Sequence, residues 1–168
     1  MAGALIVTAE IAQSDLAWLD RLRRGHFPPE RNHLTAHLTM FHALPPSSEQ
    51  EVRGALARLG SEPLPRASLH GLMDLGGGVA YRVVSADLDG MREELADQFR
   101  GLLSAQDAGG WRPHVTIQNK VPPKVARALL EQLARDFSSR PLGISGLGLH
   151  RYLGGPWEKI AIYSFRGR

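Results

Sequence analysis

The sequence predicts a layered fold of helices and strands, of the α/β or α+β class, built from two related halves. Three of the four threonines lie two residues after a histidine, in His33-Leu-Thr35, His37-Leu-Thr39 and His114-Val-Thr116. The second and third triplets stand in matching apolar contexts, AHLTMF and RPHVTIQ, one in each half of the 168-residue chain. Each half also follows the order strand, helix, strand, helix, strand, which is typical of helices that cover one face of a sheet.

In the first half, residues 4–11 (ALIVTAEI) predict a β-branched strand, and an amphipathic helix follows from Ser14-Asp15. Residues 33–44 (HLTAHLTMFHAL) alternate with a period of two, which predicts a strand that ends at Pro45-Pro46. This alternation places His33, Thr35, His37, Thr39 and Phe41 on one face and His42 on the other. A helix with Val52, Ala55, Leu56 and Leu59 on one stripe and a strand near residues 66–74 complete this half.

The second half repeats the order after the turn at Gly76-Gly77-Gly78. Residues 79–84 predict a strand, and Leu88, Met91, Leu95, Phe99 and Leu102 have helical spacing. The strand WRPHVTIQ follows Gly109-Gly110, a helix begins near Pro122, and Gly-rich strands finish the chain.

The length predicts one domain, residues 1–168, with two lobes at about 1–75 and 76–168, allowing for strand exchange between them. If a pseudo-two-fold axis relates the lobes, their sheets surround a central cleft where the two triplets converge. A monomer is the default expectation for such a pseudo-symmetric chain.

Composition narrows the class of protein. The chain has no cysteine, which removes disulfides and thiolate metal sites and fits a reducing compartment. MAGALIVTAEI has no basic leader and reaches Glu10 before a membrane-length apolar run, so we expect a cytoplasmic protein with no membrane partner. The net charge is +3, but 17 of the 20 basic residues are Arg, which suits phosphate recognition or an ordinary solvated surface.

The His-x-Thr pairs point to phosphoryl chemistry. Residues i and i+2 of a strand share a face, so each half presents an imidazole beside a hydroxyl: His37 with Thr39, and His114 with Thr116. Displacement at phosphorus needs a base and an acid on opposite sides of the phosphate, roughly in line. Two opposed histidines supply that pair, and two threonine hydroxyls can hold the non-bridging oxygens.

The segments HLTMFHALP and RPHVTIQNKV resemble the paired His-x-Thr signatures of the two-histidine phosphoesterases, the 2′-5′ RNA ligase-like proteins, and GGPWEKIAIYSF resembles their last strand. The resemblance implies an α+β, bilobal, duplicated fold whose two mainly antiparallel sheets line a central cleft, with helices outside. It implies His37, His114, Thr39 and Thr116 as catalytic residues and a metal-independent activity without a cofactor. The implied substrates are RNA ends or small nucleotides, with 2′,3′-cyclic phosphodiester hydrolysis favoured over 2′-5′ ligation or transesterification and over binding without catalysis.

Other residues have weaker signals. Side chains that could contact base or phosphate at the cleft are Phe41, Tyr81, Trp111, Arg112 and Arg151. His33-Leu-Thr35 is the alternative triplet, but His37 lies within the continuous apolar run. A metal site from His33, His37, His42 and His114 is disfavoured because His42 is expected on the opposite face and no carboxylate completes the set. Gly76–Gly78 lacks the spacing of a phosphate-binding loop.

Overall fold

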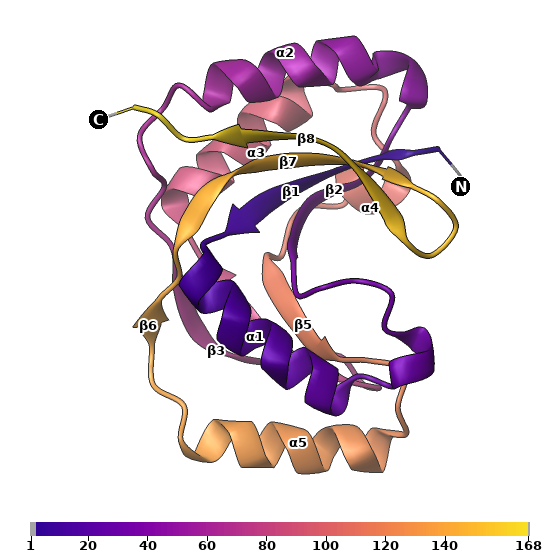
Figure 1. The fold of residues 1–168 in the computed structure, drawn as a ribbon, viewed down its shortest axis with the longest axis vertical. Helices are drawn as coiled ribbons and strands as arrows, with labels where there is room; N and C mark the ends of the chain where they lie inside the picture. Colours follow the sequence, from indigo (N-terminus) through magenta and orange to yellow (C-terminus); the bar gives the residue numbers. More distant parts are fainter. Residues whose placement is uncertain (1–2, 168) are drawn as a thin grey trace.

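The computed structural model describes residues 3–167, and their strands form two four-stranded antiparallel sheets flanked by helices (Figure 1). This confirms the predicted α+β class. The strands are β1 Leu5–Ile11, β2 Leu38–Leu44, β3 Ser68–Asp74, β4 Val79–Val84, β5 His114–Gln118, β6 Arg140–Pro141, β7 Ile144–Tyr152 and β8 Trp157–Ser164. The helices are α1 Gln13–His26, α2 Glu49–Leu59, α3 Ala86–Gln98, α4 Ala105–Ala108 and α5 Pro123–Arg135, with 3-10 turns at Pro29–Arg31 and Pro46–Ser48.

Each sheet takes strands from both halves of the sequence. One has the order β2-β1-β7-β8, so the first strand of the chain lies between β2 and a strand from the C-terminal end. The other has the order β5-β4-β3-β6, in which β3 of the first half pairs with β4 and β6 of the second. Helices α2 and α3 cover the first sheet, and α1 and α5 pack on the second (Figure 1).

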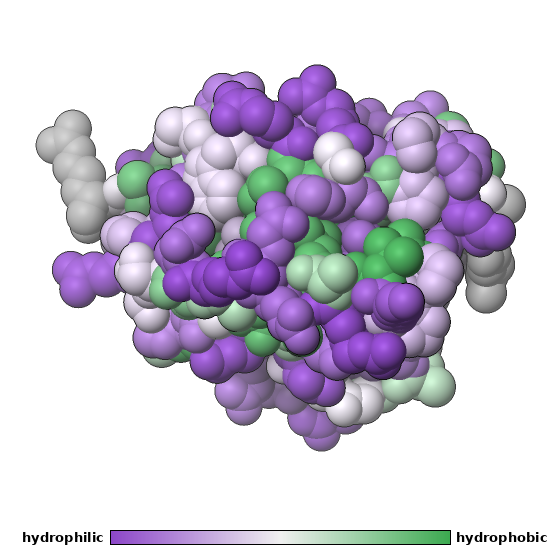
Figure 2. Space-filling model, turned by 90° about the horizontal axis from the view of Figure 1, so that it is seen from below, coloured by the Kyte–Doolittle hydropathy of each residue, from purple (hydrophilic) through white to green (hydrophobic). Residues whose placement is uncertain are grey.

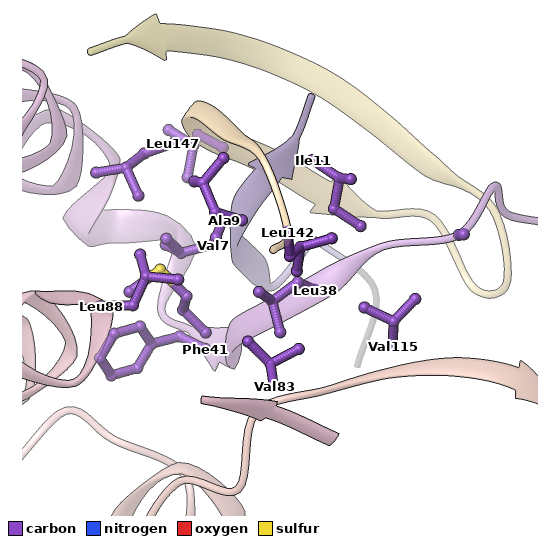
Figure 3. Close-up of a cluster of buried hydrophobic side chains, with 14 of the residues drawn as sticks. Val7, Ala9, Ile11, Leu38, Phe41, Val83, Leu88, Val115, Leu142 and Leu147 are labelled. Atoms are coloured by element: carbon purple, nitrogen blue, oxygen red, sulfur yellow. The ribbon is translucent and has the colours of Figure 1, made fainter. Parts of the chain in front are cut away.

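The hydrophobic core is continuous between the sheets. Leu38 of β2 lies beside Val83 of β4 and near Val115 of β5, while Val7 and Ala9 of β1 point toward the same cluster (Figure 3). All of these side chains are buried. The core therefore fixes β2, which carries Thr39, against β4 and β5. The second triplet lies on β5, and β4 is its neighbour in the sheet.

Helix α5 is amphipathic, as its sequence spacing predicts. Ala126 and Leu129 are buried on one side, and Leu130 and Leu133 pack against the core. The outer face of the molecule on this side is mostly hydrophilic, with hydrophobic atoms showing between the polar side chains (Figure 2). None of the helices in residues 3–167 is long and apolar enough to cross a membrane.

The second strand differs from the alternating strand predicted over residues 33–44. It begins at Leu38, and residues 32–37 form an irregular segment that leads from the 3-10 turn into the strand. A β-bulge then interrupts the pairing, because Thr8 is opposite Thr39 whereas Val7 is opposite Phe41, which leaves Met40 as an extra residue. Met40 and Phe41 are both fully buried, so the alternation reverses at this point.

Candidate active site

A cavity of about 590 Å³ lies between β2 of one sheet and β5 of the other. This volume falls within the usual range of roughly 300–1,000 Å³ for small-molecule sites. The cavity contains all four side chains predicted from the two triplets. Its lining residues are His37, Thr39, His42, Arg92, Gln106, Asp107, Gly109, Gly110, Trp111, Arg112, His114, Thr116 and Trp157.

The two triplet histidines have mirrored hydrogen bonds. Nδ1 of His37 donates to the carbonyl of Thr35 at 2.8 Å, and Nδ1 of His114 donates to the carbonyl of Arg112 at 2.7 Å. A carbonyl can only accept, so Nδ1 carries the proton in both rings and Nε2 is the nitrogen left free to react. In each case the accepting carbonyl lies two residues earlier in the chain. The same local hydrogen bond therefore orients both imidazoles.

The two threonines are held through their own carbonyls. Nε1 of Trp111 donates to the carbonyl of Thr39 at 2.9 Å, and Nη1 of Arg23 donates to the carbonyl of Thr116 at 3.1 Å. Trp111 lies just before β5, so its bond ties the second triplet's strand to the first triplet's strand. These bonds fix the two strands at the points where the two threonines line the cavity.

His37 is electrostatically unlike an exposed histidine. Burial lowers the pKa of His37 to about 4; the hydrogen bond to the Thr35 carbonyl opposes this, and the positive charge of Arg23 reinforces it. The imidazole of His37 is therefore neutral at physiological pH, and its Nε2 is a proton acceptor.

A second, smaller hollow of about 270 Å³ adjoins the cleft and shares His37 and Trp157 with it. The Trp157 ring, from β8, lies edge-on to His37 with centroids 4.7 Å apart. The alternative triplet residues His33 and Thr35 line this second hollow and are absent from the lining of the cleft. The structure therefore brings His37 and His114 together and leaves His33 to one side.

Of the five further residues predicted at the cleft, Trp111 and Arg112 line it and three do not. Phe41 is buried in the core with 0% exposure, because the bulge at Met40 turns its side chain away from the face that carries Thr39. Tyr81 is buried and lines a separate hollow beside Trp18 and Phe137. The guanidinium of Arg151 pairs with Glu49 and Glu158, outside the cleft.

Sequence reasoning missed seven lining residues, which are His42, Arg92, Gln106, Asp107, Gly109, Gly110 and Trp157. The expectation that His42 lies on the opposite face from Thr39 was wrong, because the bulge reverses the alternation between them. The adjacent apolar pair Met40-Phe41, which breaks the alternation, was the available signal. Arg92 and Trp157 lie far from both triplets in the sequence, and Asp107, although it lies shortly before His114, follows no pattern that predicted it. Within residues 3–167, no three His, Cys, Asp or Glu side chains cluster closely enough to hold a metal ion.

An α+β fold of two sheets, with one His-x-Thr triplet at the cleft from each sheet, agrees with the resemblance to the two-histidine phosphoesterases. Residues 11–156 match the family described as the 2′-5′ RNA ligase superfamily, and the chain belongs to that superfamily. No curated protein matches the sequence.

Solved structures show the same fold across the whole chain. TT0787 of Thermus thermophilus has a TM-score of 0.65 at 17% identity, covering 98% of this chain and 99% of that one. E. coli LigT complexed with NADP+ has a TM-score of 0.62 at 15% identity, with coverage of 98% and 99%. A structure described as a phosphoesterase also has a TM-score of 0.62 at 15% identity, covering 97% and 98% of the two chains.

Proposed function

We propose that this protein is a metal-independent phosphoesterase that hydrolyses 2′,3′-cyclic phosphodiesters at RNA ends or in small nucleotides. The observation that carries the proposal is the mirrored pair of Nδ1-to-carbonyl bonds, which leaves Nε2 of His37 and of His114 for one shared cavity. E. coli LigT, which has the same fold, has been solved with NADP+, 3′-AMP and ATP, and this supports a nucleotide-sized ligand here.

In this proposal, His37 is the base and His114 is the acid. Neutral His37 accepts a proton from the attacking water through Nε2 as the water oxygen bonds to phosphorus. The bond from phosphorus to the ribose 3′-oxygen breaks on the opposite side, and His114, protonated on both ring nitrogens, donates its Nε2 proton to that oxygen. The hydroxyls of Thr39 and Thr116 hold the non-bridging oxygens, and the product is a 2′-phosphate.

The test is hydrolysis of nucleoside 2′,3′-cyclic monophosphates in the presence of a chelator, with the positional isomers of the product separated. We expect turnover by the wild type and a loss of about 10²- to 10⁴-fold in kcat for His37→Ala and for His114→Ala. His33→Ala is the matched control, because His33 belongs to the alternative triplet but lines the neighbouring hollow. It should keep near wild-type activity.

The outcomes separate the competing functions. Equal loss in His33→Ala and His37→Ala would contradict the assignment of the first triplet. No hydrolysis by the wild type, with ligation or transesterification of RNA ends that needs both histidines, would establish the ligase alternative. Nucleotide binding without turnover of any substrate at any pH would establish a binding protein.

A further inference from the structure

The cleft contains a third histidine that the proposed mechanism does not use. His42 lines the same cavity as the two triplets, and its side chain is 42% exposed. It follows the bulge on β2, and along this strand it lies on the other side of Thr39 from His37. Because the proposed mechanism places the reacting phosphate between the two triplets, a role of His42 concerns the part of the ligand that extends beyond Thr39.

A buried carboxylate fixes the orientation of His42. Asp107 is 2% exposed and accepts hydrogen bonds from the backbone N–H of His42 at 2.9 Å, the N–H of Ala43 at 3.0 Å and Nδ1 of His42 at 3.1 Å. Burial by itself raises the pKa of Asp107, but these bonds outweigh burial and hold the pKa below its usual value. The carboxylate is therefore ionised and can only accept, so Nδ1 carries a proton and Nε2 is the nitrogen available to the cleft.

Two arginines add positive charge to the cavity that His42 lines. Arg92 of α3 is buried, and it donates from Nε to the carbonyl of Met40 at 3.0 Å and from Nη2 to the carbonyl of Asp107 at 2.7 Å. Its guanidinium also lies 4.1 Å from the centroid of the Phe41 ring, which fixes it further. Arg112 is exposed and lines the same cavity. Asp107 is the one carboxylate among the lining residues, and its hydrogen bonds turn it toward the protein.

We propose that His42, together with Arg92 and Arg112, forms a subsite for a second phosphate of the substrate. In an RNA end whose cyclic phosphate is attacked at the triplets, the other phosphate of the terminal nucleotide is the one on its 5′ side. The subsite binds that 5′ phosphate, with the Arg112 guanidinium and Nε2 of the His42 ring, protonated on both nitrogens, as donors and Arg92 as a fixed charge. This inference rests on the proposed function for the position of the first phosphate.

The subsite makes the enzyme selective for RNA ends and 5′-phosphorylated nucleotides over nucleosides that carry only the reacting phosphate. Asp107 is a positioning residue in this arrangement, because it acts through His42. A histidine held by a carboxylate loses little freedom when it binds an anion, so a hydrogen bond to the second phosphate is worth about tenfold in affinity.

The experiment compares the binding of adenosine 2′-monophosphate and adenosine 2′,5′-bisphosphate by calorimetry, with wild type, His42→Asn and His70→Asn. Asparagine at position 42 keeps an N–H donor near Asp107 and removes the ring edge that carries Nε2. His70 is exposed on β3 and absent from the cleft lining, so it is the matched control. Thermal unfolding of each variant reports whether the fold is intact.

The wild type and His70→Asn should bind the bisphosphate about tenfold more tightly than the monophosphate. His42→Asn should lose this preference and bind the monophosphate as the wild type does. Equal affinity of the wild type for both ligands would overturn the subsite, and so would an equal loss for both ligands in a folded His42→Asn. Because the measurement is of binding, failure of the proposed hydrolysis leaves this test intact, and the two proposals fail separately.

Discussion

The lowered pKa of His37 sets a testable limit on the pH range of the enzyme. A general base must be unprotonated, and burial lowers the pKa of His37 to about 4 from an ordinary value of 6.5. As pH falls, activity is lost only when His37 becomes protonated in the folded enzyme. We therefore expect the acid limb of kcat/KM to have its midpoint below pH 5.

The measurement is kcat/KM for a 2′,3′-cyclic mononucleotide between pH 3.5 and 9 at constant ionic strength, restricted to conditions where circular dichroism shows a folded protein. A midpoint near 6.5 would mean that the base has an ordinary histidine pKa, and it would remove His37 from that role. A rate that keeps rising toward high pH would contradict the need for a protonated acid partner.

At the residue scale, the sequence predicted the cleft residues that belong to the repeated His-x-Thr triplets. His37, Thr39, His114 and Thr116 are recognisable because each pair is local in sequence and occurs twice. Asp107 could not be found in this way, since it reaches His42 across 65 positions of the chain through hydrogen bonds that leave no local pattern. Trp157 likewise meets His37 only because β8 is placed beside the cleft by the pairing of the sheet.

At the scale of elements, the bulge in β2 shows where period-two reasoning fails. A one-residue insertion in the pairing moves the side chains that directly follow it to the other face. It buries Phe41 and brings His42 to the cleft, and a second irregularity before Leu44 returns that side chain to the core. Strand existence was predictable from the alternation, but the bulge is set by pairing with β1, which depends on the register between two separate strands.

The pairing of β1 with β7 allows a test of how tightly these strands are packed beside the hollow that adjoins the cleft. Gly148 lies opposite Thr8, and a Cβ atom there would come within 2.5 Å of Thr8 Oγ1, 2.7 Å of Glu10 Oε2 and 2.8 Å of His150 Nε2. We expect Gly148→Ala to destabilise the protein by about 1–3 kcal/mol, because these hydrogen-bonded side chains must move. Urea unfolding at neutral pH measures the change.

Gly54→Ala is the matched control for this prediction. Gly54 is an exposed position inside α2, and a Cβ there meets nothing within 4 Å. Alanine is the better helix former, so this substitution should stabilise the protein by about 0.5–1 kcal/mol. If Gly148→Ala leaves the urea midpoint unchanged while Gly54→Ala raises it, the close packing of Thr8, Glu10 and His150 around β7 is wrong.

At the scale of the whole molecule, the sheet orders make the two sequence halves depend on each other. A fragment of residues 1–75 contains β1, β2 and β3 but lacks β7, which covers one edge of β1, and β4, which pairs with β3. The fragment 76–168 lacks β1 and β3 in turn. The repeated order of elements was visible in the sequence, but the pairing of β1 with β7 was not, because strand partners are chosen by tertiary contacts.

We therefore expect each fragment alone to lack cooperative unfolding, and an equimolar mixture to fold. The break at residues 75 and 76 lies in the turn between β3 and β4, where Gly76 is exposed with a positive φ of 83° and Leu75 donates to the carbonyl of Gly78. Cutting this turn removes few packing contacts. The main cost of assembly from fragments is therefore the entropy lost when two separate chains associate. Dispersion of amide resonances in each fragment and in the mixture measures the outcome. Cooperative unfolding of either fragment by itself would show that one sheet folds without strands from the other half, and would contradict the interdependence that brings His37 and His114 to one cleft.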